Sequence, residues 1–591
     1  MQHVRAYNRL LFGVAGLGGL LFGIDVGIIA GALPYLEATS GLDPSQLSFI
    51  VAAVLLGSVI SSLVAGALAD LFGRKNLMLI SALMFVISIP LIALSHGFGP
   101  LVFGRLLQGA SAGLIGVVVP LYLAECLSAD TRGRGTGLFQ WLLTFGFVVA
   151  GLITLYFSYR LGVVSKLGNA AQIFAFKDQA WRDTFWVSLP PGLLFVLGSA
   201  VVTESPRWLL RRGKKAAALA ALQRSRTEEQ AQAELAQMEE TIAAERAKTG
   251  AGAAFKESLL RRKYVIPFIL ACVILTCNQL TGVNSIIGYN TTILLQAGLS
   301  DYQAHIGSLL FSIVNFGVTM IGVLLVDRKG RKFLLSLGSA GIVLSLLATG
   351  LLFARTQAQQ VDVKQAVQTM VRPDQTLSLT FDSAAAQKLL ASAGANAAGR
   401  AQSLEIIYSY GDYRSVTNLA RSNETSLPVT ISRSLPANKV AAFFSNPFGH
   451  LDAARTAPLK IDAALIAPVP SQSNGWLVAL TLYLFMAFFA VGPGVCVWLA
   501  LSELMPTRIR SNGMSIALFL NTGTSTVIAG VFLPTVGKYG YSAMFFGFAA
   551  CTVVYFITAT WFLPETKGKT LEQIEERFET PGGALVDEFA G

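Results

Sequence analysis

The chain has 591 residues, of which 53% are hydrophobic and only 13% are charged, and its mean hydropathy is +0.58. Soluble domains contain about 25% charged residues, so this composition excludes an ordinary soluble protein and indicates a chain embedded in a lipid bilayer. The net charge is +11. An anionic inner leaflet explains that charge without a nucleic-acid partner.

Apolar runs long enough to cross a membrane recur along the chain. A crossing of about 30 Å takes roughly 20 helical residues, and helices are favoured because unpaired backbone groups in lipid cost several kcal/mol each. The pattern therefore predicts an all-α membrane protein with twelve transmembrane helices. The predicted spans are 10–34, 47–69, 76–96, 99–126, 137–158, 184–203, 264–296, 305–326, 332–354, 475–503, 512–536 and 541–563.

Lys and Arg residues gather in alternate loops between these spans. Basic loops stay in the cytoplasm, so both termini are expected there. Residues 205–262, rich in Ala, Glu, Gln, Lys and Arg, are then cytoplasmic and predicted to form short helices. Residues 355–474 lie on the outer side, and their apolar clusters at 377–381, 404–413 and 429–431 predict a folded element with strands.

Motifs at the ends of the predicted helices occur twice. The pairs are Gly66–Lys75 with Val326–Lys332, Pro120–Arg132 with Ser502–Arg510, and Thr203–Arg207 with Pro564–Gly568. Matched motifs at matching points predict two six-helix repeats, and such repeats place a substrate site between the halves near the midplane. The predicted boundaries are 1–204 for the first half, 205–262 for the linker helices, 263–354 and 475–578 for the second half, 355–474 for the insertion, and 579–591 for a cytoplasmic tail.

Asp25 lies in the middle of the first predicted span. A carboxylate there costs about 2.5 kcal/mol or more unless it faces the interior, finds a partner or carries a proton. Burial favours its protonated form and a nearby cation favours its charged form, so a partner that moves can switch its charge. Arg105, near the start of the fourth span, is the expected partner. The alternative is an aspartate that stays paired for structural reasons.

Six motifs in a fixed order carry a family resemblance. They are Gly18–Asp25, Gly66–Lys75, Glu204–Arg207, Gln279–Asn284, Gly492–Gly494 and Pro564–Gly568. With these motifs the chain resembles the sugar porter branch of the major facilitator superfamily, which contains bacterial xylose-proton and galactose-proton symporters and the facilitative glucose carriers of animals. The resemblance extends from Gly18 to Phe578.

The resemblance implies the major facilitator fold and proton-coupled uptake of a monosaccharide by alternating access. Proton symporters of the family have an aspartate and an arginine at the positions of Asp25 and Arg105, whereas uncoupled carriers have an uncharged residue in place of the aspartate. An uncoupled carrier of sugars or polyols and a sugar receptor remain alternatives. We expect a monomer in a cell membrane, the bacterial inner membrane, with sugar, proton and bilayer as partners and with no cofactor, metal site or enzymatic activity.

The resemblance also implies which side chains bind the sugar. They are Gln140, Asn278, Gln279, Asn284, Asn315, Trp498 and Asn521. Amides and an aromatic ring suit neutral hydroxyl groups, although any one amide can instead form an interhelical hydrogen bond worth under about 1 kcal/mol. The sequence departs from the family pattern at Asn278, Gly288, Ala490 and Thr522, which leaves the identity of the sugar open.

The resemblance, more than the spacing of the repeated motifs, also implies a cytoplasmic latch. Its predicted members are Asp70, Arg74, Glu125, Arg132, Asp327, Arg331, Glu503 and Arg510. These charges are expected to pair across helix ends while the two halves are closed on the inside. The alternative is a set of exposed charges that set the topology and contribute little energy individually.

Overall fold

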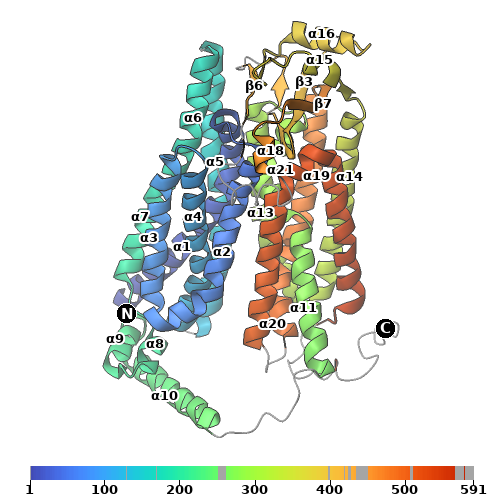
Figure 1. Cartoon of the computed structure of the whole chain (residues 1–591). Coiled ribbons are helices and arrows are strands. Elements are labelled where there is room, and N and C mark those ends of the chain that lie inside the picture. The colour runs from blue at the N-terminus through green and yellow to red at the C-terminus, as the bar shows by residue number, and fades with distance from the viewer. Residues whose placement is uncertain are drawn as a thin grey trace.

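The computed structural model describes residues 2–127, 129–167, 169–250, 261–396, 399–417, 419–423, 428–433, 435, 450–505, 510–565 and 578. Within these ranges, eleven helices are long and apolar enough to cross a membrane. The helices form two bundles that stand side by side (Figure 1).

The first bundle contains seven helices. They are α1 (Gln2–Ser40), α2 (Pro44–Phe72), α3 (Arg74–Ala93), α4 (Phe98–Cys126), α5 (Ala129–Leu167), α6 (Ala170–Trp186) and α7 (Leu189–Val201). The sixth predicted span, 184–203, covers only the end of α6 and α7, because the helical stretch starts earlier, at Ala170, and is interrupted just before Pro190 and Pro191. Short helices follow at one end of the bundle: α8 (Pro206–Arg211), α9 (Lys215–Ser225) and α10 (Glu228–Gly250).

The second bundle is formed by the remaining long helices. They are α11 (Arg262–Leu280), α12 (Val283–Gln296), α13 (Asp301–Lys329), α14 (Arg331–Gln357), α19 (Gln472–Val491), α20 (Pro493–Leu504) and α21 (Arg510–Ile557), followed by the π-helix η1 (Thr558–Phe562). Two predicted spans are broken here. The span 264–296 divides at Gly282, whose φ of +79° is left-handed, and 475–503 divides at Gly492 before Pro493, which has no backbone N–H to continue a helix.

A kink separates two parts of α21. Gly540 has φ +83° and ψ 167°, a backbone conformation that suits glycine almost alone. The two parts correspond to the predicted spans 512–536 and 541–563, while the whole stretch from Ile516 to Phe562 counts as one of the eleven apolar helices.

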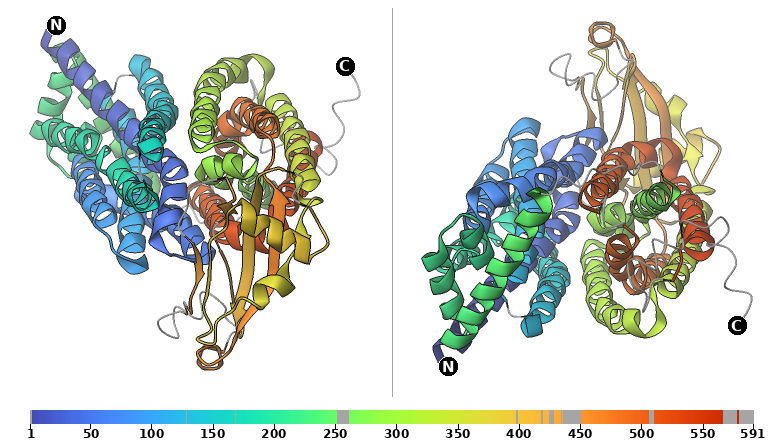
Figure 2. Two further views of the ribbon diagram at one scale, coloured as in Figure 1. Left: turned by 90° about the horizontal axis from the view of Figure 1, so that it is seen from above. Right: turned by 90° about the horizontal axis from the view of Figure 1, so that it is seen from below.

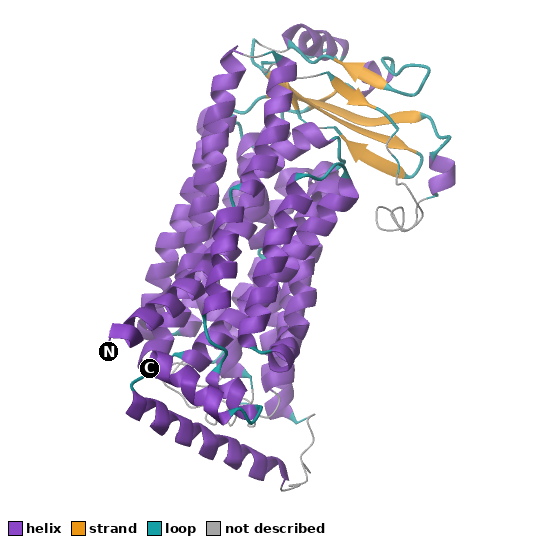
Figure 3. Cartoon of the chain, turned by 90° about the vertical axis from the view of Figure 1, so that its left-hand side faces the viewer, coloured by secondary structure: helices purple, strands orange, loops and turns teal. Residues whose placement is uncertain are grey.

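A small α/β domain lies between α14 and α19, at the end of the bundle opposite α8–α10 (Figure 3). Its five-stranded sheet has the order β1-β7-β3-β4, with β5 also paired to β3. The strands are β1 (Val361–Asp362), β3 (Gln402–Tyr410), β4 (Tyr413–Val416), β5 (Ala420–Arg421) and β7 (Leu459–Pro468), and β2 (Leu377–Leu379) pairs separately with β6 (Val429–Ile431). These strands confirm the prediction of a folded element with strands in this stretch.

The sheet of this domain packs against helices in a hydrophobic core of its own. Leu404, Ile406 and Ile461 pack with Leu389 of α16 (Ser383–Ser392) in a separate hydrophobic core, and α15 (Lys364–Gln368) adds Val367 to it. The short helix α18 (Leu451–Ala454) lies beyond that core. The domain sits against the second bundle when the molecule is viewed along the helices (Figure 2). We call this end of the molecule the sheet end, and the end with α8–α10 the linker end.

Contacts between the two bundles gather at the sheet end. Tyr35 of α1 and Ser158 of α5 both donate to Asp301 at the start of α13. The Tyr289 hydroxyl of α12 lies 3.2 Å from Ser48 Oγ of α2, and that oxygen also accepts the Leu533 N–H at 3.1 Å. The two bundles are therefore joined near the sheet.

Candidate functional site

A buried charged pair links α1 and α4. Asp25 and Arg105 are each 1% exposed, and Arg105 Nη1 lies 3.6 Å from Asp25 Oδ1. The same nitrogen donates to Gln108 Oε1 at 2.7 Å, and the guanidinium stands over the Phe185 ring at 5.6 Å. Both carboxyl oxygens of Asp25 lack a hydrogen-bond donor among the described residues. Arg105 is thus the described charged partner of Asp25, and Arg105 also donates to the neutral side chain of Gln108.

Polar side chains of α11, α12 and α21 form a hydrogen-bonded cluster. Gln279 Nε2 donates to Asn521 Oδ1 at 3.2 Å, and Asn284 Nδ2 donates to Gln279 Oε1 at 2.9 Å. Asn284 Nδ2 also lies 2.7 Å from Ser525 Oγ. The break at Gly282 makes this possible, since it lets Gln279 and Asn284 approach from two helices that meet at an angle. Three of the predicted binding amides are therefore together.

A cavity between the two bundles contains a fourth predicted amide. Its walls come from α1, α5, α12 and α13, and they include Gly27, Gly151, Asn290 and Asn315. Asn290 is 1% exposed, and neither its amide nitrogen nor its amide oxygen has a hydrogen-bond partner in the described part of the chain. Burying an unpaired amide is costly, and the Asn290 amide lies in the wall of this cavity.

The other predicted binding residues are placed less centrally. Gln140 has an exposed side chain on α5, and Asn278 is buried on α11 with its Oδ1 unpaired among the described residues. The Trp498 side chain lies outside the described residues. Asn290 and Ser525 were not predicted, although a polar residue inside an apolar span was the signal available for each.

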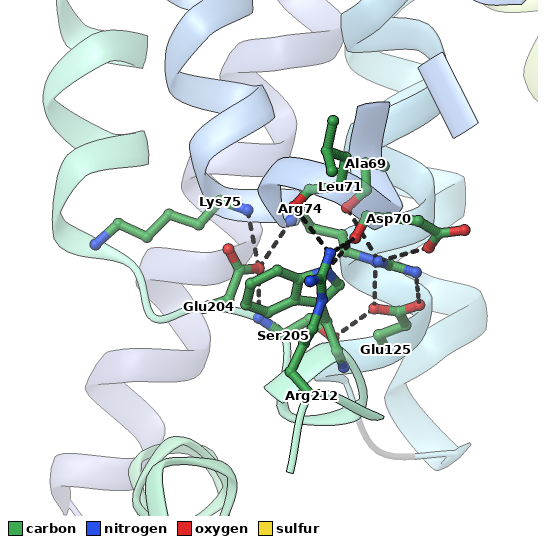
Figure 4. A network of polar contacts seen from close by, with 10 residues as sticks. Ala69, Asp70, Leu71, Arg74, Lys75, Glu125, Glu204, Ser205 and Arg212 are labelled. Atoms are coloured by element: carbon green, nitrogen blue, oxygen red, sulfur yellow. Dashed lines mark hydrogen bonds and ion pairs between the residues drawn. The ribbon is translucent and has the colours of Figure 1, made fainter. Parts of the chain in front are cut away.

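A dense polar network surrounds the turn between α2 and α3 (Figure 4). Arg74, 3% exposed, donates from Nη2 to Glu125 Oε1 at 3.0 Å. Its Nε lies at ion-pair distance from Glu125 Oε2, 2.9 Å, and its Nη1 lies 2.9 Å from Asp70 Oδ1. Glu204 Oε1 accepts the backbone N–H groups of Arg74 at 2.8 Å and of Lys75 at 3.0 Å. The network ties α2, α3, α4 and the start of the linker helices together.

The turn between α13 and α14 repeats the backbone part of this network. Glu565 accepts the N–H groups of Arg331 at 3.1 Å and of Lys332 at 3.2 Å. Gly73 and Gly330 have φ of +94° and +89°, and a Cβ on either would lie 2.2 Å or 2.3 Å from the carboxylate oxygen of Glu204 or Glu565. Sequence reasoning found the motifs that contain both glutamates but did not assign them this role.

Four of the predicted latch residues are placed by the structure, and four are not. Asp70, Arg74 and Glu125 meet within the first bundle, and Arg331 lies in the second turn, where its Nη1 donates to Val326 O at 3.2 Å. The side chains of Arg132, Asp327, Glu503 and Arg510 lie outside the described residues. The observed ion pairs are therefore contacts within one bundle.

Known proteins that are similar to this chain are transporters. Residues 11–371 and 459–578 match the family described as Sugar (and other) transporter. The glucose transporter GlcP of Staphylococcus epidermidis is 25% identical over 99% of this chain and 100% of its own length. The human proton myo-inositol cotransporter is 27% identical over 96% of this chain and 81% of its own length.

Solved structures show the same fold. The partially occluded inward open conformation of the xylose transporter XylE from E. coli superimposes with a TM-score of 0.63 at 20% identity and covers 96% of this chain and 100% of its own. The crystal structure of a D-xylose-proton symporter gives a TM-score of 0.61 at 20% identity, with 95% and 100% covered. With the family match, this fold shows a multi-pass membrane transporter and not an enzyme. The chain belongs to the sugar (and other) transporter family.

Proposed function

We propose that this protein takes up a monosaccharide together with a proton by alternating access. The observation that carries the proposal is the isolated, fully buried pair of Asp25 and Arg105. Relatives of the chain include a glucose transporter, an arabinose-proton symporter and a proton myo-inositol cotransporter, which supports a sugar or polyol as the solute.

The pair has the properties of a proton carrier. A lone carboxylate in a membrane protein is tolerated when it finds a partner or takes up a proton, and Asp25 has no described hydrogen-bond donor besides its 3.6 Å contact with Arg105. Gln108 provides Arg105 with a neutral acceptor at 2.7 Å, so the guanidinium stays bound when Asp25 is protonated. Proton uptake then removes one charge of the pair without leaving the other unsupported.

The proposed sugar site lies between the two bundles, with most of its side chains on the second bundle and Gln140 on the first. We assign the binding side chains as Gln140, Asn278, Gln279, Asn284, Asn315, Trp498 and Asn521, and we add Asn290. An amide offers a donor and an acceptor to each sugar hydroxyl, and the hydrogen bonds among Gln279, Asn284 and Asn521 hold their amides ready. The unpaired amide of Asn290 supports its addition.

The proposed topology places the linker end in the cytoplasm. Basic residues of alternate loops and of the linker helices support this side. The protein is then placed in a cell membrane, the bacterial inner membrane, with both termini on the cytoplasmic side. In this topology α21 crosses twice, on either side of Gly540, which makes twelve spans with the sheet domain outside. The proposed units are 1–204, 205–262, 263–354, 355–474, 475–578 and 579–591, in a monomer.

The proposed conformation is closed outside and open inside. The contacts of Tyr35, Ser158 and Ser48 with the second bundle at the sheet end support it. The latch formed by Asp70, Arg74, Glu125, Arg132, Asp327, Arg331, Glu503 and Arg510 is proposed to join the bundles at the linker end in the opposite state. The ion pairs that Arg74 makes with Asp70 and Glu125 are already present in this conformation, so these pairs within the first bundle do not depend on closure of the linker end.

Sugar accumulation in proteoliposomes tests the proposal. One proton moving through 100 mV contributes roughly 2.3 kcal/mol, which is about 50-fold accumulation. Asp25→Asn should still exchange labelled sugar across the membrane but should not concentrate it, because the amide keeps the shape and cannot carry the proton. Asp183→Asn, the same change at a partly exposed position of α6, should accumulate sugar as the wild type does.

Two results would contradict the proposal in different ways. Accumulation by Asp25→Asn equal to the wild type would remove this residue from coupling. A wild type that exchanges sugar and never concentrates it would identify the uncoupled carrier, the second candidate, which is the activity named for the Xenopus facilitated glucose transporter member 12, a relative 27% identical to this chain.

A further inference from the structure

A groove at the sheet end is built from three separate parts of the chain. One wall is the loop between α1 and α2 with the start of α2, at Asp43–Ser45. The second is the β3–β4 hairpin from Tyr408 to Val416, and the third is α21 near its kink, at Pro534, Gly537 and Lys538. The whole hairpin wall falls within residues 372–458, which lie outside the family match.

Tyrosine rings and hydroxyl groups line this groove. Tyr408 and Tyr410 meet edge to face with ring centroids 6.1 Å apart, and Tyr413, Ser409 and Ser415 stand beside them. Burial and the nearby Asp43 carboxylate raise the pKa of the Tyr408 hydroxyl, while its hydrogen bond with Ser415 acts in the opposite direction. The half-buried ring of Tyr408 and the hydroxyl-bearing side chains of Ser415 and Ser45 suit a ligand that has both apolar C–H faces and hydroxyl groups.

The charged groups of the groove balance one another. Asp462 accepts from Arg414 Nε at 2.9 Å and lies 3.7 Å from Lys460 Nζ. Asp412 accepts the backbone and ring N–H groups of His450, which lower its pKa. With Asp43 and Lys538, the described lining of the groove carries three acidic and three basic side chains. A balanced set of charges gives no net attraction to an anion or a cation, and so favours a neutral ligand.

The groove spans the boundary between the two bundles. Asp43–Ser45 belongs to the first bundle, whereas the hairpin is fixed to the second, because Arg421 Nη2 donates to Leu295 O at 2.5 Å and Val416 packs against Gly537. Ser48, less than one helical turn after Ser45, makes the contact with Tyr289 that joins the bundles. The groove therefore opens beside the closed end of the proposed transport path.

We infer that this groove is a second binding site for a neutral polyhydroxylated solute, and that bound solute holds the sheet ends of the two bundles together. A ligand that touches walls from both bundles binds best while the walls are adjacent, and it favours that arrangement by its difference in affinity. Rocking of one bundle against the other separates the walls. High outside solute would then slow the carrier through a site distinct from the amide cluster. The slowing rests on the proposed transport function, whereas the binding itself does not.

Equilibrium binding to the purified full chain tests the site. The probes are D-glucose, D-xylose and myo-inositol, each radiolabelled and measured separately. We expect two sites per chain for at least one probe. Ser415→Trp and Ser45→Trp, which fill the groove from opposite walls, should each leave one site, and Gln279→Ala should weaken the remaining one by 10-fold or more. Lys388→Trp, at an exposed position of α16 that lines neither the groove nor the central cavity, should keep both sites.

Uptake at increasing outside solute tests the consequence. The wild-type rate should fall at high concentration, and both groove variants should lose this fall while their half-saturation at low concentration stays within twofold. A single site in the wild type, or a second site that survives both groove variants, would overturn the inference and leave the proposed transport function intact. Binding that depends on the groove in a protein that transports none of the probes would support the site and count only against the transport function.

Discussion

The turn between α2 and α3 and the turn between α13 and α14 share a backbone design. Each has a glycine with positive φ, at Gly73 or Gly330, followed by two N–H groups that point at one carboxylate, of Glu204 or Glu565. In each turn an arginine Nη1 donates to a carbonyl five residues earlier, Ala69 O or Val326 O.

The surroundings of the two arginines differ. Arg74 is 3% exposed and is clamped by Glu125 of α4, whereas Arg331 is only partly buried. The linker helices also reach the first turn, since Trp208 Nε1 donates to Asp70 O at 2.8 Å. The common part of the repeat is thus the capture of backbone N–H groups by a carboxylate. The ion pair of Arg74 with Glu125 is described for the first bundle, and it can be broken separately from the backbone contacts.

Removing the partner of Arg74 should have the largest effect. Glu125→Ala leaves the buried guanidinium of Arg74 without its buried carboxylate partner, and breaking a buried pair in this way costs about 3–5 kcal/mol. We expect the free energy of unfolding in detergent, measured by denaturant titration, to fall by that amount. Glu125→Gln keeps the shape and one acceptor and should lose less than half as much. A loss under about 1 kcal/mol for Glu125→Ala would show that water or another acceptor replaces the pair.

Adding a methyl group to either turn glycine should have an intermediate and similar effect. Gly73→Ala and Gly330→Ala force a side chain into a backbone conformation that costs about 1–3 kcal/mol and push against the glutamate carboxylate. Their thermal unfolding should shift down together. Gly66→Ala and Gly317→Ala, in helices with nothing within 4 Å of the new Cβ, should leave stability equal or slightly higher. A shift confined to one turn would contradict the common design.

Neutralising the capping carboxylates should have the smallest effect. Glu204→Gln and Glu565→Gln keep an acceptor for the backbone N–H groups and lose only the charge, which roughly halves the strength of such hydrogen bonds. We expect about 1 kcal/mol at each position, again by denaturant titration. Glu229→Gln on α10, which is exposed, serves as the control and should change nothing measurable. Unequal losses at Glu204 and Glu565 would show that one turn depends on its charge and the other does not.

Much of the helical architecture could be predicted from hydrophobicity, because an apolar run of about 20 residues is typical of a transmembrane helix. The breaks at Gly282 and Gly492 were less visible, since both lie inside continuous apolar stretches and their backbone angles depend on neighbours such as the Phe548 ring. The pairing of Glu204 with the turn at Gly73 joins residues 130 positions apart. The repeated motifs identify Glu204 and the turn at Gly73 as important segments, but the hydrogen bonds between them are visible only in the folded structure.

For the candidate site too, the sequence indicated which residues take part but not most of their contacts. Asp25 and Arg105 were paired correctly because two opposite charges in apolar helices have few other options. The hydrogen bonds among Gln279, Asn284 and Asn521 were not foreseeable, because they depend on the angle between α11 and α12. Asn290 escaped notice because an amide inside a span signals only polarity. What marks it is the absence of a partner for either of its polar atoms among the described residues.

The pairing of the first and last strands of the sheet domain has an evolutionary consequence. β1 and β7 are antiparallel neighbours, with Val361 opposite Ile466 and Asp362 opposite Leu465, so the chain leaves and re-enters the helical bundle at adjacent points. A module with such a narrow stem can be lengthened, lost or exchanged between lineages without displacing α14 or α19. The same position is also suited to the insertion of a fluorescent reporter or an antibody epitope.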